Sequence, residues 1–285
     1  MLKFNKEEST NGKDYVRRYF SKYNSIMWSL GIGDFLTFDS YLPEFFYKRL
    51  KKIFLFTSRN STFEQLIKSN KNYSSTKIIY ADNKFDKGEI YKDGDYLNNF
   101  FKKFNLSKET CLHDDLEIWN LPRIKNIKPK ISSFFTEKLC EIDFDFLNKD
   151  YCVIFPNTKN TRDRRFFSSS DWVETIKILK YYNYKGVVLG NENFKIPNLT
   201  ELINLNSKTS IIESIEITKK AKMYIGIDSF LSTLAMQIFD QEKIYIKSVE
   251  NHLYHNIKFF SPFKNDLNFV SNRIRIRDKK IKNLI

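Results

Sequence analysis

Apolar runs of strand length alternate along the chain with segments of helical periodicity. In the first half the runs lie at residues 25–30, 51–57 and 77–81. The apolar positions at helical spacing between the first two runs are Phe38, Leu42, Phe45 and Phe46. Pro43 falls inside that series and is expected to kink or restart the helix. Strand–helix–strand alternation predicts parallel strands joined by right-handed crossovers.

The second half repeats this alternation more clearly. Strands are expected at residues 151–155, 185–190, 203–205, 222–227 and 243–247. Helices are expected at 172–179 and 230–239, and a third begins after Ser210, which forms a capping box with Glu213. Between residues 85 and 150 only two helices are expected, near 97–104 and 132–139. The irregular acidic stretch 141–149 marks the boundary, so we expect two α/β domains, 1–145 and 146–285.

Composition and cysteine use limit the class of protein. The chain has 285 residues, of which 41% are hydrophobic and 16% aromatic, enough for a substantial core. Cys111, Cys140 and Cys152 form no CxxC pair, which indicates a reducing compartment and no disulfide framework. No secretory signal is seen in the first twenty residues, and no apolar run approaches a membrane span. A cytoplasmic protein is expected.

The net charge of +14 favours phosphate-bearing partners. The chain is also enriched in Lys, Asn, Ile, Phe and Tyr, as an A/T-rich coding genome would produce, and this bias explains much of the charge. Clustering is more informative. The tail 271–285 carries six basic residues against one acid and would suit an anionic membrane surface.

Three polar loops follow the carboxyl ends of expected strands, where open α/β sheets bind ligands. Gly31-Ile32-Gly33-Asp34 turns sharply and places a carboxylate at the start of a helix; Asp34 alternatively serves only as a helix N-cap. Gly226-Ile227-Asp228-Ser229 repeats this arrangement, and Asp228 or Ser229 alternatively caps the next helix. Free N–H groups at such a helix start could also hold an anion.

The third loop, residues 157–167, is strongly basic. It offers cations and hydroxyls ahead of a helix, as a diphosphate requires, or else is a solvated basic loop. The side chains concerned are Thr158, Lys159, Thr161, Arg162, Arg164 and Arg165.

The order and spacing of these loops resemble the lipopolysaccharide heptosyltransferases, glycosyltransferase family nine, over about 150–250 and more patchily over 24–80. Gly33-Asp34 is similar to the family's Gly-Asp, whose aspartate is assigned as catalytic base. The string from Thr161 to Phe167, followed by Trp172, resembles the family's donor loop, with Arg165 in the place of a phosphate-contacting lysine. Asp228-Ser229 looks like its Asp-Ser/Thr motif, which touches donor sugar and phosphates.

The chain departs from the family pattern after Ser229. Phe230 stands where the family has the glycine that opens the phosphate pocket, and Thr233 stands where it has a histidine. These departures leave open a different donor from ADP-heptose, or a relative without activity.

The resemblance implies a GT-B fold, two Rossmann-like domains with parallel sheets facing across a cleft. Domain 1–145 would be the acceptor side, and 146–285 would be the nucleotide-sugar-binding domain. The donor-binding residues would be Gly33 in the first domain and, in the second, Thr158, Lys159, Thr161, Arg162, Arg165, Asp228 and Ser229. It further implies inverting transfer of a heptose-like sugar from a nucleotide-diphospho-sugar to a hydroxyl of a glycan or glycolipid precursor, with Asp34 as base. No cofactor is implied, and no metal, since the histidines His113, His252 and His255 lack ligand spacing.

The expected place of action is the cytoplasm, with peripheral contact at the anionic inner membrane face. The alternatives are a glycosyltransferase acting on protein or modified DNA, and a non-catalytic relative that binds nucleic acid or anionic surfaces. If the protein is the expected glycosyltransferase, nucleic acid is not expected as its partner.

Overall fold

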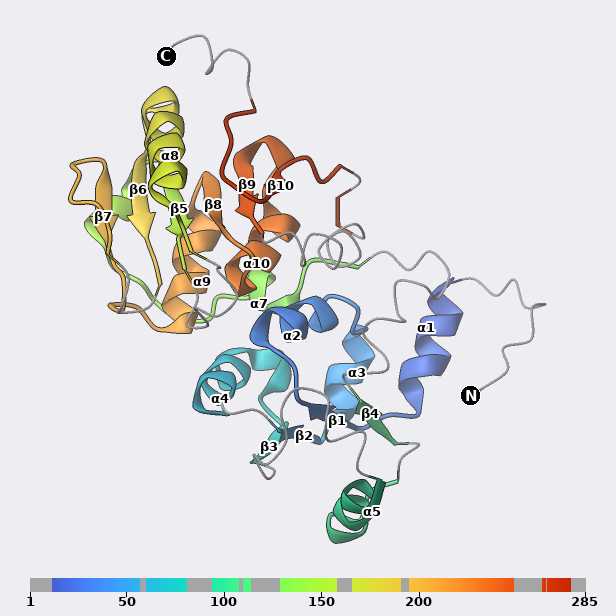
Figure 1. The fold of residues 1–285 in the computed structure, drawn as a ribbon. Helices are drawn as coiled ribbons and strands as arrows, with labels where there is room; N and C mark the ends of the chain where they lie inside the picture. Colours follow the sequence, from blue (N-terminus) through green and yellow to red (C-terminus); the bar gives the residue numbers. More distant parts are fainter. Residues whose placement is uncertain are drawn as a thin grey trace. The chain divides into compact units, whose positions relative to one another are not determined.

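The computed structural model describes residues 12–56, 60–80, 94–107, 110–113, 129–157, 166–190, 195–248, 263–264 and 266–277. By contacts the chain divides into two units (Figure 1). The first comprises Met1–Gly31 and Phe38–Lys128, and the second comprises Ile32–Thr37 and Pro129–Ile285. Residues 129–145 therefore group with the second unit, ahead of the expected boundary, and a short segment from the first third of the chain joins them.

The first unit is built on a four-stranded parallel sheet with the order β3-β2-β1-β4. Its strands are β1 (Ser25–Trp28), β2 (Lys52–Leu55), β3 (Lys77–Tyr80) and β4 (Cys111–His113). Its helical elements are α1 (Gly12–Ser21), α3 (Glu44–Arg49), α4 (Asn60–Ser69), the 3-10 turn Lys71–Tyr73 and α5 (Gly94–Lys103). Helix α2 (Ile32–Asp39) begins in the second unit and ends in the first.

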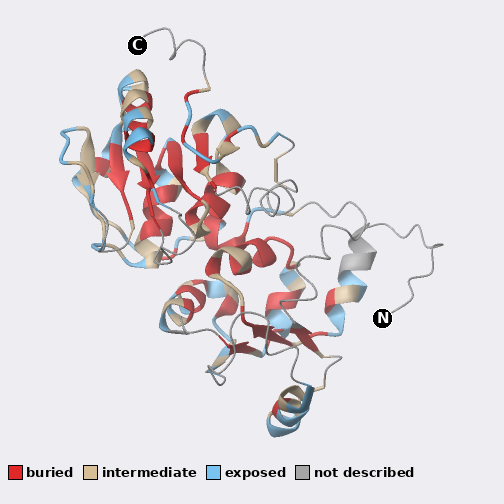
Figure 2. Cartoon of the chain, in the orientation of Figure 1, coloured by how far each residue is buried: buried red, intermediate tan, exposed pale blue. Residues whose placement is uncertain are grey.

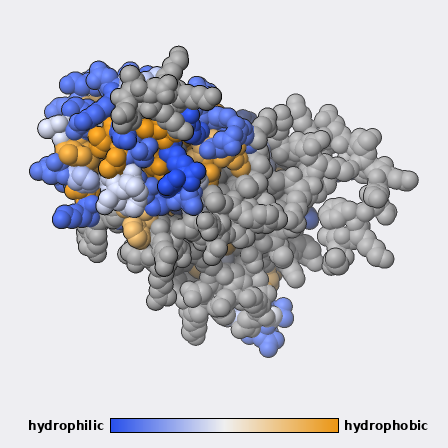
Figure 3. All heavy atoms as spheres, turned by 45° about the horizontal axis from the view of Figure 1, so that its top comes forward, coloured by the Kyte–Doolittle hydropathy of each residue, from blue (hydrophilic) through white to orange (hydrophobic). Residues whose placement is uncertain are grey.

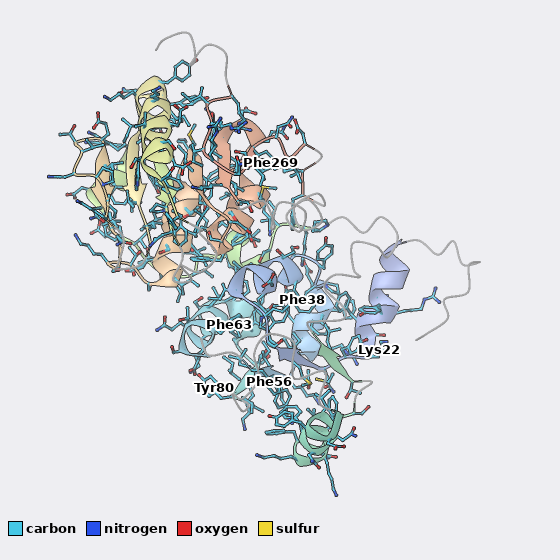
Figure 4. The ribbon with its side chains drawn as sticks, in the orientation of Figure 1. Lys22, Phe38, Phe56, Phe63, Tyr80 and Phe269 are labelled. Atoms are coloured by element: carbon cyan, nitrogen blue, oxygen red, sulfur yellow. The ribbon has the colours of Figure 1, made fainter. Side chains whose placement is uncertain are left out.

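The first unit has a buried core (Figure 2), and aromatic rings make up much of it (Figure 4). The rings of Trp28 and Phe38 lie 5.4 Å apart, and Phe63 of α4 is fully buried. On α5, Phe100 packs edge-on against Phe54 of β2 at 5.0 Å. Pro43 is the N-cap residue of α3, so the predicted restart of the helix at this proline is confirmed.

The second unit has a six-stranded parallel sheet with the order β10-β9-β8-β5-β6-β7. Its strands are β5 (Tyr151–Phe155), β6 (Lys185–Val188), β7 (Leu202–Asn204), β8 (Met223–Ile227), β9 (Ile244–Lys247) and β10 (Val270–Ser271). The helical elements are α7 (Ser133–Thr136), α8 (Ser169–Tyr182), α9 (Ile211–Lys220), α10 (Phe230–Ile238), and 3-10 turns at Asp145–Asn148 and Gln241–Lys243. Two parallel α/β sheets in tandem confirm the predicted fold class.

Buried apolar strands explain why β5 and β8 occupy the middle of this sheet. Every residue of both strands is buried (Figure 2), as expected for parallel strands covered by helices on both faces. The predicted capping box of α9 is also confirmed: the Ser210 N–H donates to Oε2 of Glu213 at 2.7 Å, and the Glu213 N–H donates to Oγ of Ser210 at 3.2 Å.

The start of the basic C-terminal tail packs onto the second unit. Ile274 and Ile276 are buried, whereas Arg273 and Arg275 between them are exposed, so the segment alternates as a strand does. The guanidinium of Arg277 lies 4.3 Å from the ring centre of Tyr245. Residues 271–277 of the basic tail therefore pack on the second unit with their arginines at 273 and 275 exposed, and residues 278–285 lie outside the described part.

One face of the second unit carries hydrophobic and hydrophilic side chains side by side. Figure 3, which brings the top of Figure 1 forward, shows hydrophobic groups among hydrophilic ones there. Phe166 and Val173 are among the large apolar side chains that remain exposed in the described part of the chain. No helix in that part is long and apolar enough to cross a membrane.

Candidate functional site

The strand order of the second unit sets where a ligand would bind. From β5 the chain proceeds to β6 and β7 on one side, and then returns to place β8 and β9 on the other. β5 and β8 are therefore the neighbours at which the strand order reverses. Open α/β sheets bind ligands outside the carboxyl ends of strands at such a point. Asp228 follows β8 directly, and Asn157 lies two residues after the end of β5.

The Asp228-Ser229 loop is held by backbone bonds and by one tyrosine. The Asp228 N–H donates to the carbonyl of Lys247 at 3.0 Å. The hydroxyl of Tyr224 donates to the carbonyl of Ile227 at 3.0 Å and lies 3.3 Å from Oγ of Ser229. Burial raises the pKa of Tyr224, and its phenol therefore stays a neutral donor.

Gly226 is required for this arrangement. The Tyr224 side chain folds back over Gly226, and a Cβ at Gly226 would collide with the tyrosine ring and come within 2.9 Å of the Phe155 carbonyl. The glycine of the Gly-Ile-Asp-Ser loop thus makes room for the ring that holds Ser229.

Ser229 begins helix α10. Its N–H donates to Oγ of Ser232 at 2.9 Å, and that hydroxyl donates back to the Ser229 carbonyl at 2.6 Å. Ser229 is therefore the N-cap residue of α10, as the capping alternative expects. Capping leaves its partly exposed side chain beside Asp228 at the positive end of the helix dipole.

The Gly33-Asp34 turn lies against the first turn of α10. A Cβ on Gly33 would be only 3.3 Å from Cα of Phe230 and from Oγ1 of Thr233. Gly33 and α10 both belong to the second unit. The Gly33-Asp34 loop and the Asp228-Ser229 loop, separated by nearly two hundred residues in the sequence, thus come together. Only a glycine at position 33 allows this contact without displacing the neighbouring atoms.

Asp34 is the third residue of α2 and is partly exposed. Because the helix begins at Ile32, Asp34 is not its N-cap residue, and that alternative is wrong. A carboxylate in the first turn is still favoured by the helix dipole. Phe35, fully buried beside it, packs its ring 6.0 Å from that of Phe134 and fixes this turn.

Phe230 and Thr233, the two departures from the family pattern, face this same contact. The Phe230 ring packs edge-on against Phe155, at the end of β5, with centroids 5.8 Å apart. Thr233 is buried, and its hydroxyl donates to the carbonyl of Ser229 at 3.4 Å. Both therefore contribute to packing at the start of α10.

The basic loop lies outside the described residues, and so do Thr158, Lys159, Thr161, Arg162 and Arg165. Its two ends are described. Asn157 and Phe166 form an antiparallel bridge, and the Phe167 N–H donates to the Pro156 carbonyl at 2.9 Å. The loop therefore begins and ends at the carboxyl end of β5, at the switch point of the sheet.

Sequence patterns did not predict a buried ion pair that supports the stem of the basic loop, the paired residues Asn157 and Phe166 at its two ends. Lys247 donates from Nζ to the Phe166 carbonyl at 2.9 Å and to Oδ2 of Asp171 at 2.6 Å. Asp171 is fully buried and is the third residue of α8. In the sequence the only signals of this pair are a lysine at the end of a strand and an aspartate in the first turn of a helix, and neither is specific.

Hydrogen bonds decide the ionisation of Asp171. Burial alone would raise the pKa of its carboxyl, but bonds from Lys247, from the Ser168 hydroxyl and N–H, and from the Ile274 N–H outweigh burial and lower it. The Ile274 bond, at 2.8 Å to Oδ1, ties the C-terminal segment to the start of α8.

No group of three or more His, Cys, Asp or Glu side chains suited to a metal ion occurs in the described part of the chain. His252 and His255 lie outside that part. The described polar groups at the switch point are carboxylates, hydroxyls and amides.

No family model and no curated protein matches the chain. Among solved structures, its fold is similar to a family 9 glycosyl transferase from Veillonella parvula, with 12% identity and a TM-score of 0.46 over 91% of this chain and 89% of that one. It is also similar to the dodecameric iron-containing heptosyltransferase TibC in complex with ADP-D-beta-D-heptose, with 12% identity, a TM-score of 0.40, and coverage of 86% of this chain and 61% of that one. TibC from enterotoxigenic E. coli gives 13% identity and a TM-score of 0.43 over 78% of this chain and 56% of that one. The chain spans about three fifths of the length of TibC, and likenesses at these values identify no activity.

Proposed function

We propose that this protein is a metal-independent glycosyltransferase that moves a sugar from a nucleotide-diphospho-sugar to a hydroxyl group, inverting the anomeric carbon. The observation that carries the proposal is the close contact of Gly33 with Phe230 and Thr233. It sets the turn that bears Asp34 against the helix start that bears Asp228 and Ser229. A carboxylate and a helix N-terminus side by side are the two groups that sugar transfer needs.

Each group has a role in the proposed reaction. The start of α10, the basic side chains of Lys159 and Arg165 and the hydroxyl of Thr161 would hold the diphosphate, which leaves with its negative charge. Asp34 would take the proton of the acceptor hydroxyl as its oxygen bonds to the anomeric carbon. The bond from that carbon to the diphosphate oxygen breaks in the same step, so the product is a nucleoside diphosphate.

Cations and helix dipoles would replace a divalent ion in this scheme. General-base catalysis of this kind contributes about 10²- to 10⁴-fold, and stabilisation of charge on the leaving group contributes more. The acceptor we propose is a glycan or glycolipid precursor at the cytoplasmic membrane face. The exposed side chains of Arg273 and Arg275 support contact with such an anionic surface.

A thermal-shift screen against nucleotide sugars tests the proposal directly. A ligand at one hundred times its dissociation constant stabilises the folded protein by about 2.7 kcal/mol. We expect one class of nucleotide sugar to raise the melting temperature and to be turned over with an added glycan acceptor. Steeply salt-dependent binding of DNA with no response to any nucleotide sugar would contradict the proposal.

A further inference from the structure

Two buried amide oxygens converge on Gly190, two residues after the end of β6. Gly190 has a φ of +151°, a conformation that side chains disfavour. A Cβ there would lie 2.9 Å from Oδ1 of Asn157 and 3.0 Å from Oδ1 of Asn206. The absence of a side chain at Gly190 therefore keeps a space into which both oxygens point.

Three neighbouring strands build this arrangement. Asn157 follows β5, Gly190 follows β6, and Asn206 follows β7. The Ser207 N–H donates to the Gly190 carbonyl at 3.0 Å, and the Asn206 N–H donates to Oδ1 of Asn204 at 3.0 Å. These bonds fix Asn206, and the antiparallel bridge to Phe166 fixes Asn157.

Neither oxygen has a hydrogen-bond partner within the part of the chain that the structure describes, although both atoms are buried. Asn157 as a whole is only 7% exposed. A buried acceptor without a partner is destabilising, and proteins contain few of them. Two such acceptors at one point indicate that a group from outside the chain supplies the donors.

We propose that Asn157 and Asn206 form a subsite that accepts hydrogen bonds from a vicinal diol of the donor substrate. This inference rests on the proposed function. Two neutral acceptors that share one space match two hydroxyl donors on adjacent carbons, a pair that both a ribose and a sugar ring carry. Asn157 also belongs to the stem of the basic loop at the switch point. A ligand whose phosphates lie at the start of α10 would extend across the end of β5 to reach this subsite.

Such a subsite gives specificity as well as affinity. A site whose buried polar groups are paired only by the correct substrate rejects analogues that lack the matching groups, because those analogues leave the site's acceptors unpaired. The two asparagines are thus specificity-determining residues that select ligands with both hydroxyls.

Leucine substitutions separate this role from a structural one. Asn157→Leu and Asn206→Leu keep the number and branching of the side-chain heavy atoms and remove the acceptor. Because the acceptors are unpaired in the free protein, both variants should unfold at the same or higher denaturant concentration than the parent. Affinity for the ligand should fall roughly three- to tenfold for each lost hydrogen bond. Asn198→Leu, at an exposed asparagine of the same unit, is the matched control.

Calorimetry with defined probes completes the test. The probes are ADP, GDP, UDP and CDP, their 2′,3′-dideoxy forms, and the glucose-bearing nucleotide sugar of each. If the ribose supplies the diol, dideoxy probes bind the parent as weakly as complete probes bind the variants. If the sugar supplies it, only the nucleotide sugars lose affinity in the variants.

Three results would overturn the inference. Unchanged affinity of both leucine variants for all probes would leave the proposed function standing and remove the subsite. Destabilisation of both variants well beyond Asn198→Leu would mean that ordered water pairs the oxygens and that their role is structural. Absence of binding of any probe to the parent would refute the proposed function and the subsite with it.

Discussion

Nζ of Lys247 lies 2.6 Å from Oδ2 of Asp171, in an ion pair whose aspartate is fully buried and whose lysine side chain is 13% exposed. The pair joins the end of β9 to the first turn of α8. Asp171 also accepts from the Ile274 N–H, and Lys247 also donates to the Phe166 carbonyl. Four segments of the second unit therefore meet at one carboxylate and one ammonium group.

Removing the lysine should destabilise the second unit. Lys247→Met leaves the Asp171 carboxylate buried without its cation, and losing one partner of a buried pair costs about 3–5 kcal/mol. Denaturant unfolding followed by tryptophan fluorescence measures this change. Lys138→Met is the control, since Lys138 pairs with Glu141 at the surface and should change stability by no more than about 0.5 kcal/mol. Equal effects of the two variants would contradict the assigned role of Lys247.

Acid should weaken the same cluster. The pKa of Asp171 is lowered in the folded protein, so its contribution to stability is present above the ordinary carboxyl pKa of about 4 and is lost as the pH falls through the lower folded-state value. We expect the free energy of unfolding to fall as the pH drops below about 4, and to fall less in Asp171→Asn. Urea midpoints over that range check this; parallel pH profiles for the two proteins would show that other carboxyls dominate.

Asp34 should be needed for turnover and hardly at all for stability. Asp34→Asn keeps the shape but removes the proton acceptor, so turnover should fall about 10²-fold or more while donor affinity stays nearly constant. Stability should change by about 0.3–1 kcal/mol, the value of a carboxylate in the first turn of a helix. Steady-state kinetics, calorimetry and urea unfolding give the three quantities.

Asp143→Asn, at an exposed site in the second unit, controls for the loss of a negative charge. Near-normal turnover in Asp34→Asn would end the assignment of Asp34 as the base, whatever the donor proves to be.

Two truncations should differ sharply. Removing residues 271–285 should destabilise the protein more than removing 278–285, because the longer truncation also deletes the buried Ile274 and Ile276 and the bond from the Ile274 N–H to Asp171. Loss of one large buried aliphatic side chain alone costs about 2–5 kcal/mol. Thermal unfolding distinguishes the two, and equal stability would mean that the segment 271–277 contributes little.

Chelation should leave transfer intact. The proposed leaving-group stabilisation comes from helix α10 and basic side chains, so sugar transfer is expected to continue at the same rate in excess EDTA. Activity that disappears with EDTA and returns on addition of a divalent ion would exclude the proposed mechanism.

Sequence patterns predicted the elements that bury continuous apolar runs. Residues 151–155 and 222–227 correspond closely to β5 and β8, because strands buried on both faces must be apolar throughout. β4 and β10, three and two residues long, were not predicted. Their strand character comes from pairing with β1 and β9, which no local pattern encodes.

The candidate site was predictable only in part, for a similar reason. Polar residues after strand ends revealed the Asp34, Asp228 and basic loops. Asp171 was not predicted, since its partners Lys247 and Ile274 lie far along the chain. Asn206 was not predicted either, because its convergence with Asn157 depends on the order of β5, β6 and β7.

The membership of Ile32–Thr37 in the second unit has a consequence for biosynthesis. During translation this turn leaves the ribosome about 190 residues before α10, the helix it packs against. At 5–20 residues per second, α10 is synthesised about 10–40 s after this turn. During that time Phe35 and Leu36, which are fully buried in the folded protein, lack the helix against which their turn packs. Slower elongation would lengthen this exposure, so the yield of soluble protein should depend on translation speed and on chaperones that cover nascent apolar segments.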